Sequence, residues 1–223
     1  MSEKCSFLRA RRPAQKAQRR AALLAAAGEL VDELGTMGVS VGAIAKRVGL
    51  SKGNLYRYFE SREAILLELL YEGWVEWVGV VERDLAPLAG NDDAAAVAVV
   101  LARSAAERPR TCALMAIMSS VLEQNVSADQ VKDFKLRGLG LFIRLGNALH
   151  AALPSLGIDG ARDFLTAFMA LLAGLWPMAN PPPVVATVLE LPELQGFQHD
   201  FESSLQRSSS ALLLGMMANT VRH

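Results

Sequence analysis

Hydrogen-bond donors crowd one short segment of this chain. Asn54 and Arg57 carry side chains of the types that form paired hydrogen bonds with adenine and guanine edges. Lys52 and Tyr56 carry types that can bond phosphate oxygens. Gly53 removes a side chain where a helix would have to approach another molecule closely. This combination predicts contacts with double-stranded nucleic acid.

The residues around this segment predict that it is the second helix of a helix-turn-helix. Gly49 stands where the turn needs a positive φ, and Ala45 is small where two crossing helices approach each other. Ser40 and Ser51 stand where each helix needs an N-cap, and helix starts also favour phosphate. Apolar residues recur at positions that would form one buried seam, namely Ile44, Val48, Leu50, Leu55 and Phe59.

Charge is segregated along the chain although its total is zero. Residues 1–62 hold 12 Lys and Arg against 5 Asp and Glu, a net charge of +7, which leaves −7 for residues 63–223. A basic front and an acidic rear predict a polyanion-binding module joined to a part that avoids polyanions. The first 15 residues form a basic arm that contains Pro13, and we expect this arm to be poorly ordered.

Apolar spacing along the rest of the chain predicts an all-α protein. From about residue 16 to 34, apolar residues recur at spacings of four and three, and Gly35 ends the pattern. A long helix should begin near Glu63 and continue to about Arg83, as a connector to the remainder. Prolines separate further helical patterns, at 92–107, 110–124, 127–151, 159–176 and 199–219. The mixed segment 184–197 has no clear assignment.

Several protein classes are disfavoured by what the sequence lacks. Cys5 and Cys112 lie far apart without metal-ligand spacing, so we expect no disulfide framework, no metal site and a reducing cytoplasm. No apolar run follows the basic start, so we expect no secretory signal. The longest apolar stretch, at 164–179, is too short for a membrane span. Nucleotide-binding, nucleophile-elbow and His-Glu metal motifs are missing, so we expect no cofactor and no enzyme.

Residues 22–70 resemble the TetR family of bacterial repressors. The resemblance is carried by an amphipathic first helix and by the segment VSVGAIAKRVGLSKGNLYRYFESREAILLELL at 39–70. It covers under a quarter of the chain, and the remainder is similar only in being helical and of suitable length. It implies a three-helix DNA-binding domain at 16–62 and a helical effector-binding and dimerisation domain at 63–223. The implied partner is a palindromic operator in double-stranded DNA, bound by a homodimer through successive major grooves.

The resemblance also implies roles for individual residues. Lys52, Gly53 and Asn54 would meet bases, and Arg57 could reach either a base or a phosphate. Arg62 occupies a position that usually holds Lys and anchors the following helix to the DNA backbone. The full set of expected DNA contacts is Ser40, Ser51, Lys52, Gly53, Asn54, Tyr56, Arg57, Tyr58 and Arg62.

Two other features bear on the expected DNA contacts. Gly42 departs from members with a long side chain at that position, so a base contact there is lost. The basic arm could add phosphate contacts or reach a minor groove through Arg9, Arg11, Arg12, Lys16, Arg19 and Arg20.

For the rear domain, the resemblance implies two further interactions. The helices at 161–176 and 205–217 would pair with their copies in a second subunit as a four-helix bundle. A small apolar or amphipathic effector would lie between the connector helix and its neighbours, where it would shift the spacing of the recognition helices. Taken singly, each candidate cavity residue is more often ordinary core than part of a ligand site. The candidates are Trp74, Trp77, Met115, Met118, Phe134, Phe142 and Phe168.

Alternatives stay open at this point. A helical protein that binds DNA without sequence preference would have similar affinity for all duplexes and a steep dependence on salt. A regulator that uses no ligand is a second alternative. Activation in place of repression also remains open, because the difference depends on where the operator lies.

Overall fold

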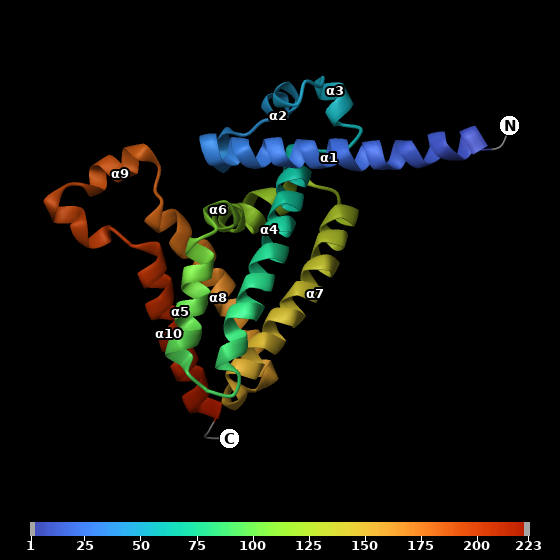
Figure 1. Cartoon of the computed structure of the whole chain (residues 1–223). Coiled ribbons are helices and arrows are strands. Elements are labelled where there is room, and N and C mark those ends of the chain that lie inside the picture. The colour runs from blue at the N-terminus through green and yellow to red at the C-terminus, as the bar shows by residue number, and fades with distance from the viewer. Residues whose placement is uncertain (1–2, 221–223) are drawn as a thin grey trace.

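The computed structural model describes residues 3–220, and the side chains of residues 14–219. Within that range the chain is helical and contains no strand (Figure 1). The α-helices are α1 (Glu3–Gly38), α2 (Val41–Arg47), α3 (Lys52–Leu55), α4 (Arg62–Leu85), α5 (Ala94–Ala106), α6 (Pro109–Ile117), α7 (Ala128–Ala152), α8 (Gly157–Ala179), α9 (Pro183–Leu189) and α10 (Phe201–Thr220). The all-α prediction is therefore confirmed.

The long helices form a bundle that α1 crosses at one end (Figure 1). Helices α2 and α3 lie on the outer side of α1, and α4 runs from there into the bundle. Within the bundle, α4 packs on α7, and α10 packs on both α5 and α8. A single buried core extends without a break from Leu23 of α1 to Leu213 of α10. The DNA-binding domain expected from the sequence and the rear domain therefore share one core.

The turn between α2 and α3 forms as the residue types predict. The hydroxyl oxygens of Ser40 and Ser51 accept hydrogen bonds from the backbone N–H groups of Ala43 and Asn54, at 3.1 and 3.3 Å. Gly49 has φ 69°, in the left-handed region that favours glycine. Each cap satisfies a backbone donor that the start of a helix would otherwise leave unpaired.

Helix α3 is shorter than the sequence predicted. It ends at Leu55 after one turn, so Phe59 lies beyond it. Phe59 is still buried, because its N–H continues the helical path with a 3.3 Å hydrogen bond to the Leu55 carbonyl. Val48 and Leu50 are only half-buried. The buried part of the seam is therefore Ile44, Ala45, Leu55 and Phe59.

The arm at 1–15, which we expected to be poorly ordered, is helical from Glu3 onward. Its Ala, Arg, Lys, Gln and Leu residues are strong helix formers, which is a sufficient local reason. The predicted stop is confirmed, because Gly35 has φ 70° and ψ 169° and breaks the helical path. The side chains of Arg9, Arg11 and Arg12 lie outside the described ones.

The rear helices follow the predicted ranges with two differences. The predicted helix at 110–124 ends at Ile117 and continues as a π-helical turn over 118–122 and a 3-10 turn over 123–125. The unassigned segment 184–197 contains most of α9 and a 3-10 turn over 192–197, and nearly all of its side chains are exposed or half-exposed.

Arg62, at the start of α4, is directed into the protein. Its Nε donates to the Val39 carbonyl at 2.7 Å, and Nη2 donates to the Thr36 carbonyl. Nη1 bonds Glu63 Oε1 at 2.9 Å. The guanidinium thus binds the chain that leaves α1 to the first turn of α4. Three of the five N–H donors of Arg62 are used in these bonds, and only 17% of its side chain is accessible, so a role within the protein is better supported than the expected anchoring of DNA.

We predict that Arg62→Ala lowers the free energy of unfolding by about 1–3 kcal/mol, because two carbonyls lose a charged donor. Urea unfolding followed by circular dichroism measures this change. Arg57→Ala removes an exposed guanidinium nearby and should leave the unfolding midpoint unchanged. An unchanged midpoint for Arg62→Ala, with loss of nucleic-acid binding alone, would restore the DNA-anchoring role.

Candidate nucleic-acid interface and apolar cavity

α3 and the two residues that follow it present the expected donors to solvent. Lys52, Asn54, Tyr56 and Arg57 are all exposed, and 54% of Tyr56 is accessible although it is a large aromatic residue. On the opposite side, Leu55 is fully buried. A Cβ added at Gly53 would have no neighbouring atom within 4 Å, so the backbone there borders open space. The structure therefore gathers five of the predicted residues on one accessible face.

Gly42 has a specific effect on this face. A Cβ at position 42 would lie 2.7 Å from Cε of Lys52. The glycine therefore lets the Lys52 side chain lie across the start of α2, where a larger residue would displace it. The glycine at position 42, where the sequence departs from the family that it resembles, thus makes room for the Lys52 side chain.

The cations on this side of the protein differ in their partners. Arg47 forms paired hydrogen bonds with Glu33, both at 2.7 Å, and a third with Glu29 at 3.4 Å. The hydrogen bond from Arg47 holds the pKa of Glu33 below its ordinary value. Among the described residues, Lys52 and Arg57 have no carboxylate partner. These two charges are available to an anion, whereas that of Arg47 is already neutralised.

Ser40, Ser51 and Tyr58 complete the predicted set. Both serines are exposed, and their oxygens accept the N-cap bonds, so their hydroxyl protons remain free to donate. Tyr58 is half-buried and packs against the core. It lines a polar hollow between the DNA-binding domain and α7, together with Arg20, so its ring does not share the open face of Tyr56. A phosphate contact from Tyr58 is therefore less well supported than one from Tyr56.

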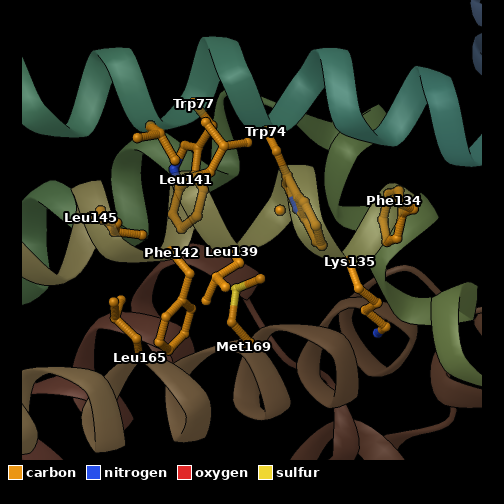
Figure 2. A pocket seen from close by; sticks show the side chains of 12 residues that line it. Trp74, Trp77, Phe134, Lys135, Leu139, Leu141, Phe142, Leu145, Leu165 and Met169 are labelled. Carbon is orange, nitrogen blue, oxygen red and sulfur yellow. The ribbon is translucent and has the colours of Figure 1, made fainter. Parts of the chain in front are cut away.

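A cavity of about 230 Å³ lies between α4, α7 and α8 (Figure 2). Of the predicted residues, Trp74, Trp77, Phe134 and Phe142 line it. The sequence did not single out eight others, which are Val78, Lys135, Gly138, Leu139, Leu141, Leu145, Leu165 and Met169. The α7 residues among them recur at helical spacing, which was the available signal for this wall.

Three predicted cavity residues lie elsewhere. Phe168 is fully buried and stacks on Trp77, with ring centroids 6.0 Å apart and planes 8° apart. Met115 is buried on α6, and Met118 is half-buried in the π-helical turn that follows α6. All three belong to the core or its edge. No residue of α6 lines the cavity, and Phe168 stacks on Trp77 without lining the cavity itself.

The cavity offers few polar groups. Figure 2 shows the Trp74 ring between Trp77 and Phe134, and its centroid lies 5.3 Å from that of Phe134. The indole Nε1 of Trp74 is buried without a hydrogen-bond partner. Lys135 stands at the wall, and its Nζ lies 2.5 Å from Glu123 Oε1. The cavity can thus take an apolar molecule.

Other chemistry finds little support in the described residues. No group of three or more His, Cys, Asp or Glu side chains there could hold a metal ion. Burial raises the pKa of the Cys112 thiol to about 12, which makes it unreactive at neutral pH. Across residues 3–220, no single helix has the length and apolar character needed to cross a membrane. One consecutive pair, Ala128–Ala152 with Pro154–Ala179, passes by length and composition together but is bent by 114°.

Known structures show the same fold. A transcriptional regulator from Rhodococcus sp. Rha1 is 19% identical, with a TM-score of 0.55, and the match covers 88% of this chain and 96% of that one. The TetR family regulator PfmR from Thermus thermophilus is 18% identical, with a TM-score of 0.54 and coverage of 86% and 96%. FadR from Bacillus subtilis, solved in complex with stearoyl-CoA, is also 18% identical, with a TM-score of 0.54, and the match covers 86% of this chain and 96% of that one.

Family models cover both parts of the chain. No curated protein matches it. Residues 23–69 match the model of bacterial regulatory proteins of the tetR family. Residues 72–220, more than half of the chain, match the tetracyclin repressor-like C-terminal domain. Together with the exposed donors on α3, these matches show that the chain belongs to the TetR family of DNA-binding transcriptional regulators.

Proposed function

We propose that this regulator is a homodimeric repressor that binds a specific palindromic operator in the cytoplasm and is released by a small apolar or amphipathic effector. The observation that carries the proposal is the exposed row of unpaired donors on α3, held outward by the burial of Leu55. A helix of this kind docks in the major groove, and two-fold symmetry of the protein would be mirrored in the operator.

The exposed residues fall into two groups, those that would contact bases and those that would contact phosphates. Lys52, Gly53 and Asn54 stand at the start of α3, where they would meet base edges. Tyr56 would donate to a phosphate, and Arg57 could serve either purpose. Ser40 and Ser51 would donate their hydroxyl protons to phosphates at the starts of α2 and α3. Arg62 and Tyr58 would act from within the protein, by holding these helices in place.

The outer faces of α8 and α10 support pairing with a second copy. Thr166, Ala170 and Gly174 are exposed along α8, and small residues allow helices to approach closely. On α10, Ala211 is exposed, and 57% of Leu214 is accessible. An apolar stripe of this kind on two neighbouring helices fits a four-helix interface between subunits.

The cavity supports a small effector. A cavity of about 150 Å³ is sufficient to hold benzene, so 230 Å³ fits a ligand of one or two rings or a short chain. The pocket is partly open to solvent, so this volume sets no upper limit on the length of an effector. The stearoyl-CoA bound by FadR of Bacillus subtilis makes an amphipathic molecule with an apolar chain one candidate effector class for this chain.

Selection of bound duplexes from a random pool tests the proposal. We expect a consensus with two-fold symmetry, bound about 10³–10⁷ times more tightly than random duplex. Equal affinity for all sequences, with steep salt dependence, would instead identify a non-specific DNA-binding protein. Transcription assays on the selected site separate repression from activation, and they show whether any effector is needed for release.

The roles on α3 predict different results for two variants. Asn54→Ala should relax discrimination at one or two base pairs of the selected site, because it removes a base contact. Tyr56→Phe should weaken binding to all sequences alike, because it removes a phosphate donor. Repeating the selection with each variant measures both effects. If the two variants gave the same change in consensus, this assignment of roles would be wrong.

The pairing faces predict the effect of a charge on α8. Ala170→Glu should convert the dimer to a monomer and weaken operator binding, because two carboxylates would be buried near the symmetry axis. Sedimentation velocity measures the change in mass. The matched control is Ala151→Glu, an identical change at an exposed position near the end of α7. A dimer that survives Ala170→Glu would place the subunit interface elsewhere.

A further inference from the structure

Two Arg–Glu ion pairs join α7 to α4. Arg137 donates Nη1 and Nη2 to the two carboxylate oxygens of Glu68, at 3.2 and 2.9 Å. Arg144, two turns further along α7, donates Nε and Nη2 to Glu82 at 2.9 and 2.5 Å. Gly138 and Leu141, which line the cavity, lie between the two arginines in the sequence of α7. The pairs therefore hold α7 on α4 at both ends of this part of the cavity wall.

The pair nearer to the DNA-binding domain has a third member. Arg20 of α1 donates Nη1 to Glu68 Oε1 at 3.3 Å, and its Nη2 lies 3.2 Å from Glu68 Oε2. The same guanidinium lies over the Phe59 ring, 4.7 Å from its centroid. Among the described residues, Glu82 has no corresponding link to α1. One carboxylate thus binds the DNA-binding domain, the connector helix and the cavity wall together.

The environment of Glu68 makes this junction sensitive to the position of either arginine. Only 15% of the Glu68 side chain is accessible. Burial acts to raise its pKa, but the hydrogen bonds from Arg137 and Arg20 outweigh burial and hold the pKa below its ordinary value. The carboxylate is therefore charged at neutral pH. A partly buried charge that loses one partner is costly, so the remaining groups must rearrange.

The cavity lies next to this junction. Phe134 lines the cavity and also lines the polar hollow that contains Arg20, Glu68 and Arg137. It lies three residues before Arg137 on α7, one turn away on the same side of the helix. The Arg137 guanidinium also lies over the Tyr71 ring of α4, 4.2 Å from its centroid. Any molecule that pushes α7 away from Trp74 would therefore act directly on Arg137.

We infer that the junction of Arg20, Glu68 and Arg137 transmits occupancy of the cavity to the DNA-binding helices. The inference rests on the proposed function, since it needs an effector that acts from this cavity. A ligand between α4 and α7 would draw Arg137 away from Glu68. Glu68 and Arg20 would then shift together and move α1 and Phe59, behind α3. These three are positioning residues, because none of them contacts DNA in this scheme.

A side chain that fills the cavity replaces the unidentified effector in the test. A Cβ at Gly138 would lie 3.4 Å from the Trp74 ring, so Gly138→Leu projects into the space between α4 and α7. The quantity measured is the ratio of dissociation constants for the selected operator with and without this substitution. We expect a loss of affinity of about 10-fold in the otherwise native chain, within the usual range of allosteric coupling.

The same ratio is then measured in three backgrounds. With Glu68→Gln it should fall below about threefold, because the amide has no charge and only one acceptor oxygen and cannot hold Arg20 and Arg137 together. With Glu82→Gln it should stay near the native value, since this is the same change in the other α4–α7 pair. With Asp32→Asn it should also stay near the native value. Asp32 ties α1 to Arg110 of α6, away from the cavity, so this control removes an ion pair of α1 without touching the proposed route.

The outcomes separate the inference from the proposed function. An undiminished ratio with Glu68→Gln would overturn the role of the junction and leave the proposed function intact. No effect of Gly138→Leu in the native chain, with folding verified by circular dichroism, would overturn effector release itself and the inference with it. If Gly138→Leu does not fold, Met169→Trp fills the cavity from α8 and replaces it in every background.

Discussion

The burial of Leu55 and Phe59 is the constraint on which the DNA-binding face depends. A single helical turn such as α3 has no stability of its own, because its nucleation cost exceeds what one or two hydrogen bonds return. It persists because Ser51 caps it and because the two apolar side chains are buried in the core that also contains residues of α1, α2 and α4. Their burial also decides which side of α3 faces outward. The exposed donors are thus a consequence of the core behind them.

The connector helix α4 extends that core from the DNA-binding helices into the rear bundle. Ile65 and Leu66 of its first turns are buried with the DNA-binding helices, whereas Trp77 and Val78 lie in the rear bundle and line the cavity. No flexible linker separates the two parts, so a displacement at the cavity cannot be absorbed between them. Buried Trp77 adds rigidity through its 3.0 Å hydrogen bond to Ser104 of α5. Because α4 is continuous, the DNA-binding helices and the cavity belong to one packed unit.

Local sequence signals predicted the elements well, because caps, glycines and apolar spacing act over a few residues. Ser40, Ser51 and Gly49 adopt the predicted geometry, and the exposure of Asn54 follows from the pattern around it. Directions of side chains that depend on distant neighbours were not predictable. Arg62 turns toward carbonyls 23 and 26 positions earlier in the chain, and no local pattern shows that those carbonyls lack other donors. Aromatic spacing on α8 likewise favours Phe168, although Leu165 and Met169 are the α8 residues that reach the cavity.

A polar junction between α1, α4 and α7 suits a switch better than an apolar one would. Hydrophobic side chains of similar volume would pack the same space with comparable or greater stability, but such contacts weaken gradually as helices slide. The hydrogen bonds around Glu68 depend steeply on distance and angle, so a small displacement of α7 breaks them. Because the carboxylate is partly buried, breaking one side of the junction disfavours the whole arrangement. Two discrete arrangements with a modest difference in free energy are what the proposed release by an effector would require.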